Sequence, residues 1–117
     1  MWLVENKTDK VFKYTGAASR LSGSQSATSS FSLASGNTNG KGIVTDGTSL
    51  WVVEDGSSSD KVYKYTVSGT AKGSWTIDAA NSHPTGLTIN PSNVSDIWIV
   101  DNGTAKFYQY TAAASRT

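Results

Sequence analysis

The stretch that decides the fold is Trp51-Val52-Val53-Glu54, which is followed after a polar turn by Val62-Tyr63-Lys64-Tyr65-Thr66. The same pair of segments occurs twice more, as Trp2-Leu3-Val4-Glu5 with Val11-Phe12-Lys13-Tyr14-Thr15 and as Trp98-Ile99-Val100-Asp101 with Phe107-Tyr108-Gln109-Tyr110-Thr111. The leading tryptophans are 49 and 47 residues apart, a period that is typical of arrays of repeated structural units. The chain therefore holds about two and a half repeats of one unit.

The composition excludes several classes of partner. The chain has 117 residues, with ten Lys and Arg against nine Asp and Glu, and no basic run that could follow a phosphate backbone. We therefore expect no nucleic-acid partner, and no membrane partner either, because no apolar run is long enough to cross a bilayer. Cysteine is absent, which excludes disulfides and thiolate metal sites. Met1-Trp2 already begins a predicted strand, so no signal peptide is expected and the localisation stays open.

The best-preserved repeat predicts four short strands. Gly42 to Thr45 is an apolar run, Leu50 to Glu54 follows a turn, Lys61 to Thr66 follows a polar loop, and Gly73 to Asp78 follows a second turn. In the fourth strand, apolar and polar residues alternate, which is typical of a half-buried strand. The alternation is shared by two repeats, since Phe31, Leu33, Trp75 and Ile77 alternate with Ser30, Ser32, Ser74 and Thr76.

Four consecutive antiparallel strands joined by tight loops form one blade of a β-propeller. The sequence therefore predicts an all-β fold of about two and a half such blades, with residues 1–117 as a single module. If the strands are lettered A to D from the axis outward, the chain gives strands BCD over 2–34, a blade ABCD over 41–79 and strands ABC over 85–111. The small apolar segments at Gly42 and Gly86 favour the innermost position for strand A.

Three motifs carry a resemblance to known propellers: Thr85-Gly86-Leu87-Thr88-Ile89, the turn from Asp46 to Val53, and the strand from Asp60 to Tyr65. They resemble NHL-like and SMP-30/lactonase-like bacterial propellers. The resemblance implies the architecture, whereas the chemistry stays open, because such propellers include scaffolds, lectins, lactonases and lyases. Lactonase-like members bind a divalent metal at the channel mouth, but no inward carboxylate of this chain matches that motif.

The incomplete first and last repeats predict self-association. Apolar blade faces left in water cost about 25 cal/mol per Å², and unpaired strand edges invite pairing. Copies of the chain related by cyclic symmetry would remove both problems. We favour a homodimer with six blades, with a homotrimer of two blades per chain, or a dimer of five blades, as alternatives. A monomeric open fragment is the remaining possibility.

The candidate ligand site lies at the loops that lead into strand A. His83 is the only histidine, and Asn39 is its counterpart in the preceding repeat. Together with Asn37 and Asn81 these residues would form a ring of hydrogen-bonding groups in an oligomer. A single histidine without an acidic partner fixed by spacing is a weak basis for catalysis, so no catalytic residue, metal site or cofactor is predicted.

Two other residue series receive a structural interpretation. The Trp2, Trp51 and Trp98 series could stack on sugars, but its position at the start of strand B favours packing, as for Tyr14, Tyr65 and Tyr110. Carboxylates at the end of strand B could chelate calcium, yet their spacing lacks the dense alternation of a calcium loop. Turn formation is the better interpretation of these carboxylates, which are Glu5, Glu54 and Asp101 with their neighbours Asp55 and Asn102.

The sequence thus predicts a non-catalytic propeller module that assembles with itself and serves as a binding unit, for which glycans are the candidate ligand, or as a scaffold. One alternative is a symmetric building block, natural or engineered, that has no ligand. The other is a metal-dependent lactonase- or lyase-like enzyme that uses His83.

Overall fold

The computed structural model describes residues 1–117 and is all-β, as predicted, with three antiparallel sheets. The first sheet contains β1 (Trp2–Glu5), β2 (Lys10–Lys13) and β3 (Ser29–Ser32). The second contains β4 (Gly40–Thr45), β5 (Ser49–Glu54), β6 (Lys61–Thr66) and β7 (Ala71–Thr76). The third contains β8 (Pro84–Asn90), β9 (Asn93–Asp101) and β10 (Lys106–Tyr110). Two single-turn 3-10 helices, η1 (Ala17–Ser19) and η2 (Ala113–Ser115), follow β2 and β10.

Within each sheet, strands adjacent in the chain pair with one another. Only the second sheet has four strands, because the first begins one strand late and the third ends one strand early. None of the three sheets closes on itself. None of the helices has the length and apolar composition that crossing a membrane requires.

The fourth strand of the second sheet begins and ends two residues earlier than the predicted Gly73 to Asp78. It begins earlier because pairing with β6 continues past a bulge, in which Lys64 pairs with Gly73 while Tyr65 pairs with Ala71. It ends at Thr76 because Thr76 pairs with Lys61, where β6 begins. Gly73 has a φ of 148°, a conformation that residues with a side chain rarely adopt. The predicted alternation nevertheless continues past the strand end, because Ile77 is buried and its N–H donates to the carbonyl of Asp60 over 3.0 Å.

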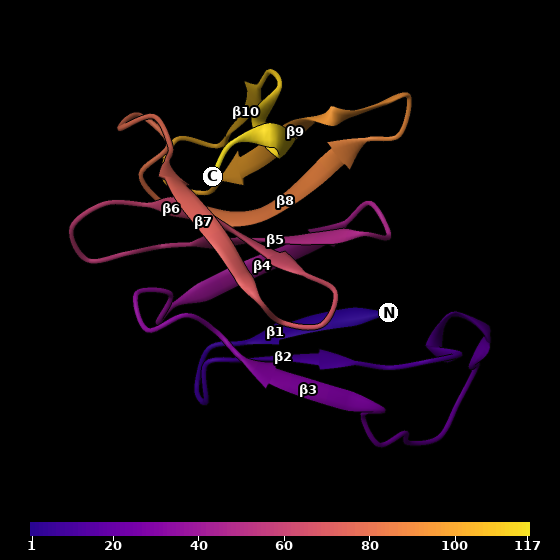
Figure 1. Ribbon diagram of the computed structural model, residues 1–117. Coiled ribbons are helices and arrows are strands. Elements are labelled where there is room, and N and C mark those ends of the chain that lie inside the picture. The colour runs from indigo at the N-terminus through magenta and orange to yellow at the C-terminus, as the bar shows by residue number, and fades with distance from the viewer.

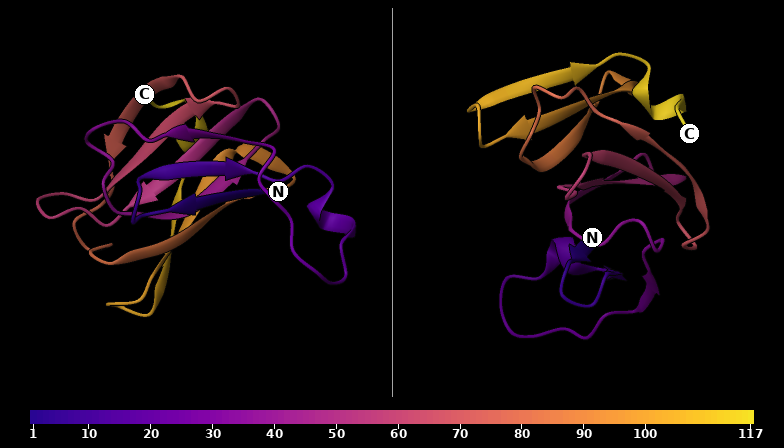
Figure 2. Two further views of the ribbon diagram at one scale, coloured as in Figure 1. Left: turned by 90° about the horizontal axis from the view of Figure 1, so that it is seen from below. Right: turned by 90° about the vertical axis from the view of Figure 1, so that its left-hand side faces the viewer.

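The three sheets stack in chain order, and the second sheet lies between the other two (Figure 1). Figure 2 shows the same order from two further directions, with the N-terminus at the first sheet and the C-terminus near the third. The inner strand β4 contacts both β1 and β8, so the sheets meet most closely along one side of the stack. This arrangement buries the second sheet on both faces and the other two on one face each.

Each sheet has two apolar faces of different composition. We call one the tyrosine face; it consists of Met1, Leu3 and Tyr14 in the first sheet, Leu50, Val52 and Tyr65 in the second, and Ile97, Ile99 and Tyr110 in the third. We call the other the tryptophan face; it consists of Trp2, Val4 and Val11, then Trp51, Val53 and Val62, then Trp98, Val100 and Phe107.

The core consists of two contacts of the same kind. The tyrosine face of the second sheet packs on the tryptophan face of the first. The tyrosine face of the third sheet packs on the tryptophan face of the second. Because one face pattern is repeated, both contacts bury aliphatic and aromatic side chains in the same relative positions, and such burial stabilises the fold by roughly 25 cal/mol per Å² of apolar surface.

The inner strands approach so closely that they require a glycine at one position. A Cβ placed on Gly42 would lie 2.7 Å from the Cα of Gly86, a backbone atom that has no room to move aside. A Cβ placed on Gly86 would meet only a methyl group of Val100 at an ordinary 3.6 Å. Gly42 and Gly86 therefore mark the closest approach of β4 and β8.

We expect Gly42→Ala to destabilise the fold by about 1 to 3 kcal/mol, because the added methyl forces β4 and β8 apart. Gly86→Ala is the matched control, and its free energy of unfolding should stay close to that of the unchanged chain. Urea denaturation followed by tryptophan fluorescence measures both. Equal stability of the two variants would contradict the close approach of the inner strands.

Candidate functional site

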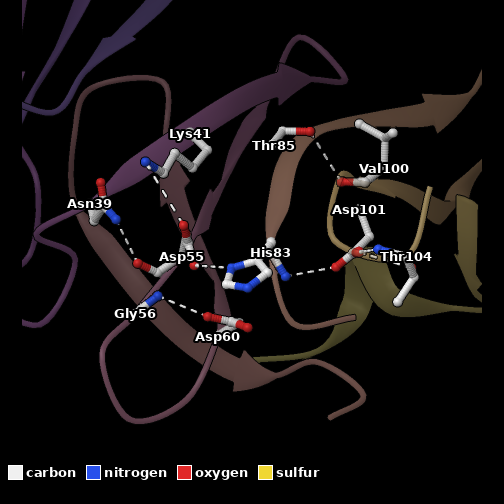
Figure 3. Close-up of polar contacts among 10 residues, drawn as sticks. All are labelled: Asn39, Lys41, Asp55, Gly56, Asp60, His83, Thr85, Val100, Asp101 and Thr104. Atoms are coloured by element: carbon white, nitrogen blue, oxygen red, sulfur yellow. Dashed lines mark hydrogen bonds and ion pairs between the residues drawn. The ribbon is translucent and has the colours of Figure 1, made fainter. Parts of the chain in front are cut away.

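Polar side chains of the second and third sheets gather at the end of the stack where strand B of each repeat ends (Figure 3). Asn6, which follows β1 of the first sheet, joins them through Asn39. We call this group the loop cluster; it consists of Asn6, Asn39, Lys41, Asp55, Asp60 and His83. Antiparallel pairing brings the group together, because the start of β4, the end of β5 and the start of β6 lie at the same end of the second sheet.

Asp55 links the residues of the loop cluster. Its backbone carbonyl accepts a hydrogen bond from the side-chain amide of Asn39 at 2.7 Å, and Asn39 in turn accepts one from the side chain of Asn6 at 3.2 Å. Its carboxylate lies 3.7 Å from Nδ1 of His83 and 3.9 Å from Nζ of Lys41. These long contacts between partly exposed groups contribute little to stability.

His83 has an acidic neighbour that spacing within one repeat does not reveal. Asp55 lies on the loop after β5 of the second sheet, whereas His83 precedes β8 of the third. The histidine is fixed through its backbone, since its N–H donates to Asp101 over 2.7 Å and its carbonyl accepts from the N–H of Asn102 over 3.1 Å. Its ring lies over Gly103, where a Cβ would approach the ring to 2.7 Å.

The structure divides the four predicted ligand residues into two pairs. Asn37 and Asn81 are fully buried, so neither offers its amide to a ligand at the surface. Asn39 is half-buried and His83 is exposed, and both lie beside Asp55. Only Asn39 and His83 are therefore brought together as an accessible polar pair.

The two buried asparagines belong to a repeated clamp on the connections between sheets. The Tyr65 hydroxyl accepts hydrogen bonds from Asn37 Nδ2 and from the N–H of Ala34, each at 3.1 Å. In the next repeat the Tyr110 hydroxyl accepts from Asn81 Nδ2 at 3.2 Å and from the N–H of Asp78 at 3.1 Å. Each tyrosine thus holds the segment that leads into its own sheet.

A second tyrosine in each repeat reinforces the clamp as a donor. The Tyr63 hydroxyl donates to the carbonyl of Gly36 at 2.6 Å, and the Tyr108 hydroxyl donates to that of Ala80 at 2.8 Å. Burial, followed by the nearby Glu54 carboxylate, raises the pKa of Tyr63 to about 12. Burial also raises the pKa of Tyr65, and it outweighs the two donors that favour the ionised form. Both hydroxyls are therefore protonated at neutral pH.

The carboxylates at the end of strand B cap backbone groups. Glu5 accepts from the hydroxyl and N–H of Thr8, Glu54 accepts from the N–H of Thr38, and Asp101 accepts from the N–H groups of His83 and Thr104. Burial favours the neutral form of Asp101, but these hydrogen bonds outweigh it and lower the pKa. The turn-forming interpretation of these residues agrees with this geometry.

Asp60 differs from these capping carboxylates. Its pKa is raised by burial, only partly offset by the hydrogen bond from the N–H of Gly56, and raised further by the negative charge of Asp55. Nowhere in the structure do three His, Cys, Asp or Glu side chains come together in a way that could hold a metal ion. The loop cluster can exchange hydrogen bonds with a polar ligand.

The tryptophan series divides according to its place in the stack. Trp51, between two sheets, is buried, whereas Trp2 and Trp98 on the end sheets are only half-buried. The same holds for the tyrosines, since Tyr65 is buried and Tyr14 and Tyr110 are half-buried. Trp51 and Tyr65 are packed between sheets, and Trp2 and Tyr110 also pack against the two core clusters. Trp98 and Tyr14 lie on the uncovered faces of the end sheets.

Comparisons of the chain with protein-family models, with curated proteins and with solved structures gave no match.

We expect Tyr65→Phe to lower the free energy of unfolding by about 1 to 3 kcal/mol, because Asn37 then keeps a buried amide without its acceptor. Tyr14→Phe is the matched control from the first repeat, since the Tyr14 hydroxyl forms no hydrogen bond within the chain. Thermal or urea unfolding of both variants measures the difference. A Tyr65→Phe variant as stable as Tyr14→Phe would mean that the clamp contributes nothing.

Proposed function

We propose that this chain is a non-catalytic β-propeller module that assembles with copies of itself into a closed ring and serves as a binding or scaffold unit. The observation that carries the proposal is the uncovered apolar face at each end of the stack. On the first sheet, Met1 and Leu3 are 64% and 41% exposed, and on the third sheet Phe107 is 74% exposed. Their counterparts in the second sheet, Leu50, Val52 and Val62, are fully buried.

Self-assembly is expected because exposure of these apolar faces to water is energetically unfavourable. Large contiguous apolar patches on a soluble protein usually mark interaction surfaces. Here two such faces lie on opposite ends of one stack, so a closed ring of copies would cover both at once. Three sheets per chain support the homodimer, because two chains supply six sheets, a number within the range of four to eight blades that propellers use. A homotrimer remains the alternative assembly.

The binding role rests on the loop cluster. At one end of the stack, His83 lies beside the Asp55 carboxylate and Asn39 binds the Asp55 backbone carbonyl, so both are placed to exchange hydrogen bonds with a ligand. In a ring this end is repeated around the axis, which multiplies weak polar contacts. Hydroxyl-rich glycans suit such a surface, because they present many groups that both donate and accept hydrogen bonds. The scaffold role needs no ligand and uses assembly alone.

We expect sedimentation velocity to show a discrete oligomer, with the dimer as the favoured species. Leu3→Lys should shift it toward monomer, because a charge would be buried in the covered face. Val67→Lys is the control, since Val67 is similarly exposed, at 39%, but lies in the turn that follows β6 of the second sheet. A monomer at all concentrations would contradict assembly, and equal effects of the two variants would contradict the assignment of the face.

We expect a glycan array probed with the labelled chain to show retention that His83→Ala and Asn39→Ala both weaken. Asn93→Ala is the control, because Asn93 lies at the opposite end of β9 from the loop cluster. Absence of any retained glycan would contradict the binding role and leave the scaffold role. Retention that survives both loop substitutions would place the ligand elsewhere.

A further inference from the structure

The two uncovered faces of this chain correspond to the two halves of the contact that is repeated inside it. The first sheet exposes its tyrosine face, and the third sheet exposes its tryptophan face. Inside the chain, a tyrosine face always packs on the tryptophan face of the preceding sheet. The contact that the two uncovered faces could form between copies therefore already occurs twice within the chain.

The uncovered tryptophan face of the third sheet is concave. Trp98, Val100 and Phe107 line a shallow hollow of about 230 Å³ together with Leu87 and the backbone of Gly86. At the equivalent place on the second sheet, Trp51 and its neighbours are covered by Ile97, Ile99 and Tyr110 of the third sheet. Nothing in the chain covers the hollow on the third sheet.

The positions of the two 3-10 helices independently support the packing of the tyrosine face on a tryptophan face. Ala113 of η2 is fully buried against the second sheet, and the Ala114 carbonyl accepts a hydrogen bond from Lys64 Nζ at 2.8 Å. The first repeat has the matching segment, in which Ala17 and Ala18 of η1 correspond to Ala113 and Ala114. This η1 has no preceding sheet to pack against, and Ala17 is only half-buried.

We propose that the tryptophan face of the third sheet receives the tyrosine face of the first sheet of a second copy, head to tail, with η1 of that copy seated as η2 is seated within the chain. This inference rests on the proposed assembly and specifies its contact. In this contact, the hollow beside Phe107 of one copy is covered by Met1, Leu3 and Tyr14 of the other. Gln109, which corresponds to Lys64, lies opposite Ala18 of the second copy.

A second copy is the occupant that the residues favour. Both halves of the contact are present on the same chain, so identical copies satisfy each other without any further partner. The alternative among copies pairs like with like, tryptophan face on tryptophan face, and has no precedent among the contacts within the chain. Head-to-tail contacts close into a ring or extend into a filament, according to the rotation between copies.

The test uses the absence of cysteine, which makes introduced thiols unique. Gln109→Cys and Ala18→Cys are made in separate chains, co-refolded from urea and treated with a short bis-maleimide linker. The Lys64→Cys/Ala114→Cys double variant, in which the same two positions meet within one chain, shows that the linker spans this geometry. Crosslinked products are measured by denaturing mass spectrometry, and the oligomeric state of each uncrosslinked sample by sedimentation velocity.

The expected result is a crosslinked pair of chains in the mixture and loss of that product when either variant is treated alone. An oligomer whose single variants crosslink as well as the mixture would overturn the head-to-tail contact and support like-with-like pairing. An oligomer without crosslinks in the mixture would also overturn this contact, while the proposed assembly would stand. A monomer in every sample would overturn the assembly itself, and the inference with it.

Discussion

The packing of a tyrosine face on a tryptophan face is the contact on which the rest of the structure depends. A three- or four-stranded sheet with apolar residues on both faces cannot cover itself, and it becomes stable only between neighbours. The second sheet has neighbours on both sides, and Leu50 and Trp51, which point to opposite faces, are both buried. The end sheets have one neighbour each. The degree of burial of equivalent residues therefore reports their place in the stack.

The same repeated contact organises the loop cluster. Stacking the sheets brings the loop after β5 beside the segment before β8, so that Asp55 and His83 meet although they belong to different sheets. The tyrosine clamps fix the connecting segments, because Tyr65 and Tyr110 bind the buried asparagines just before strand A. Positions next to these asparagines are then held at the surface. The polar surface at this end is thus a consequence of how the core is connected.

Much of the fold could be predicted from the sequence because one pattern is repeated. The spacing of Trp2, Trp51 and Trp98 and the alternation in the fourth strand predict three sheets in the observed strand order. The boundaries of β7 could not be predicted, because the bulge at Gly73 depends on pairing across strands. Ring closure by self-association remains a prediction, since it concerns contacts beyond a single chain.

The candidate site was predictable only in part. Sequence position identified the loops before strand A, and Asn39 and His83 lie there at the surface. The burial of Asn37 and Asn81 was missed, because the partner of each asparagine is a tyrosine almost thirty residues later in the chain. Their recurrence before strand A with a matching tyrosine on strand C was the signal that could have revealed the clamp. Asp55 was considered only as a turn or calcium residue, since its contact with His83 crosses between sheets.

Hydrogen–deuterium exchange of dilute and concentrated samples, read peptide by peptide, tests most directly the claim that the end faces are two halves of one contact. If the end faces form one contact between copies, exchange in β1, β2, β9 and β10 slows together as concentration rises, while β5 and β6, already covered on both faces, stay unchanged. Exchange in both end sheets that does not depend on concentration would contradict this contact, as would protection confined to one of the two sheets.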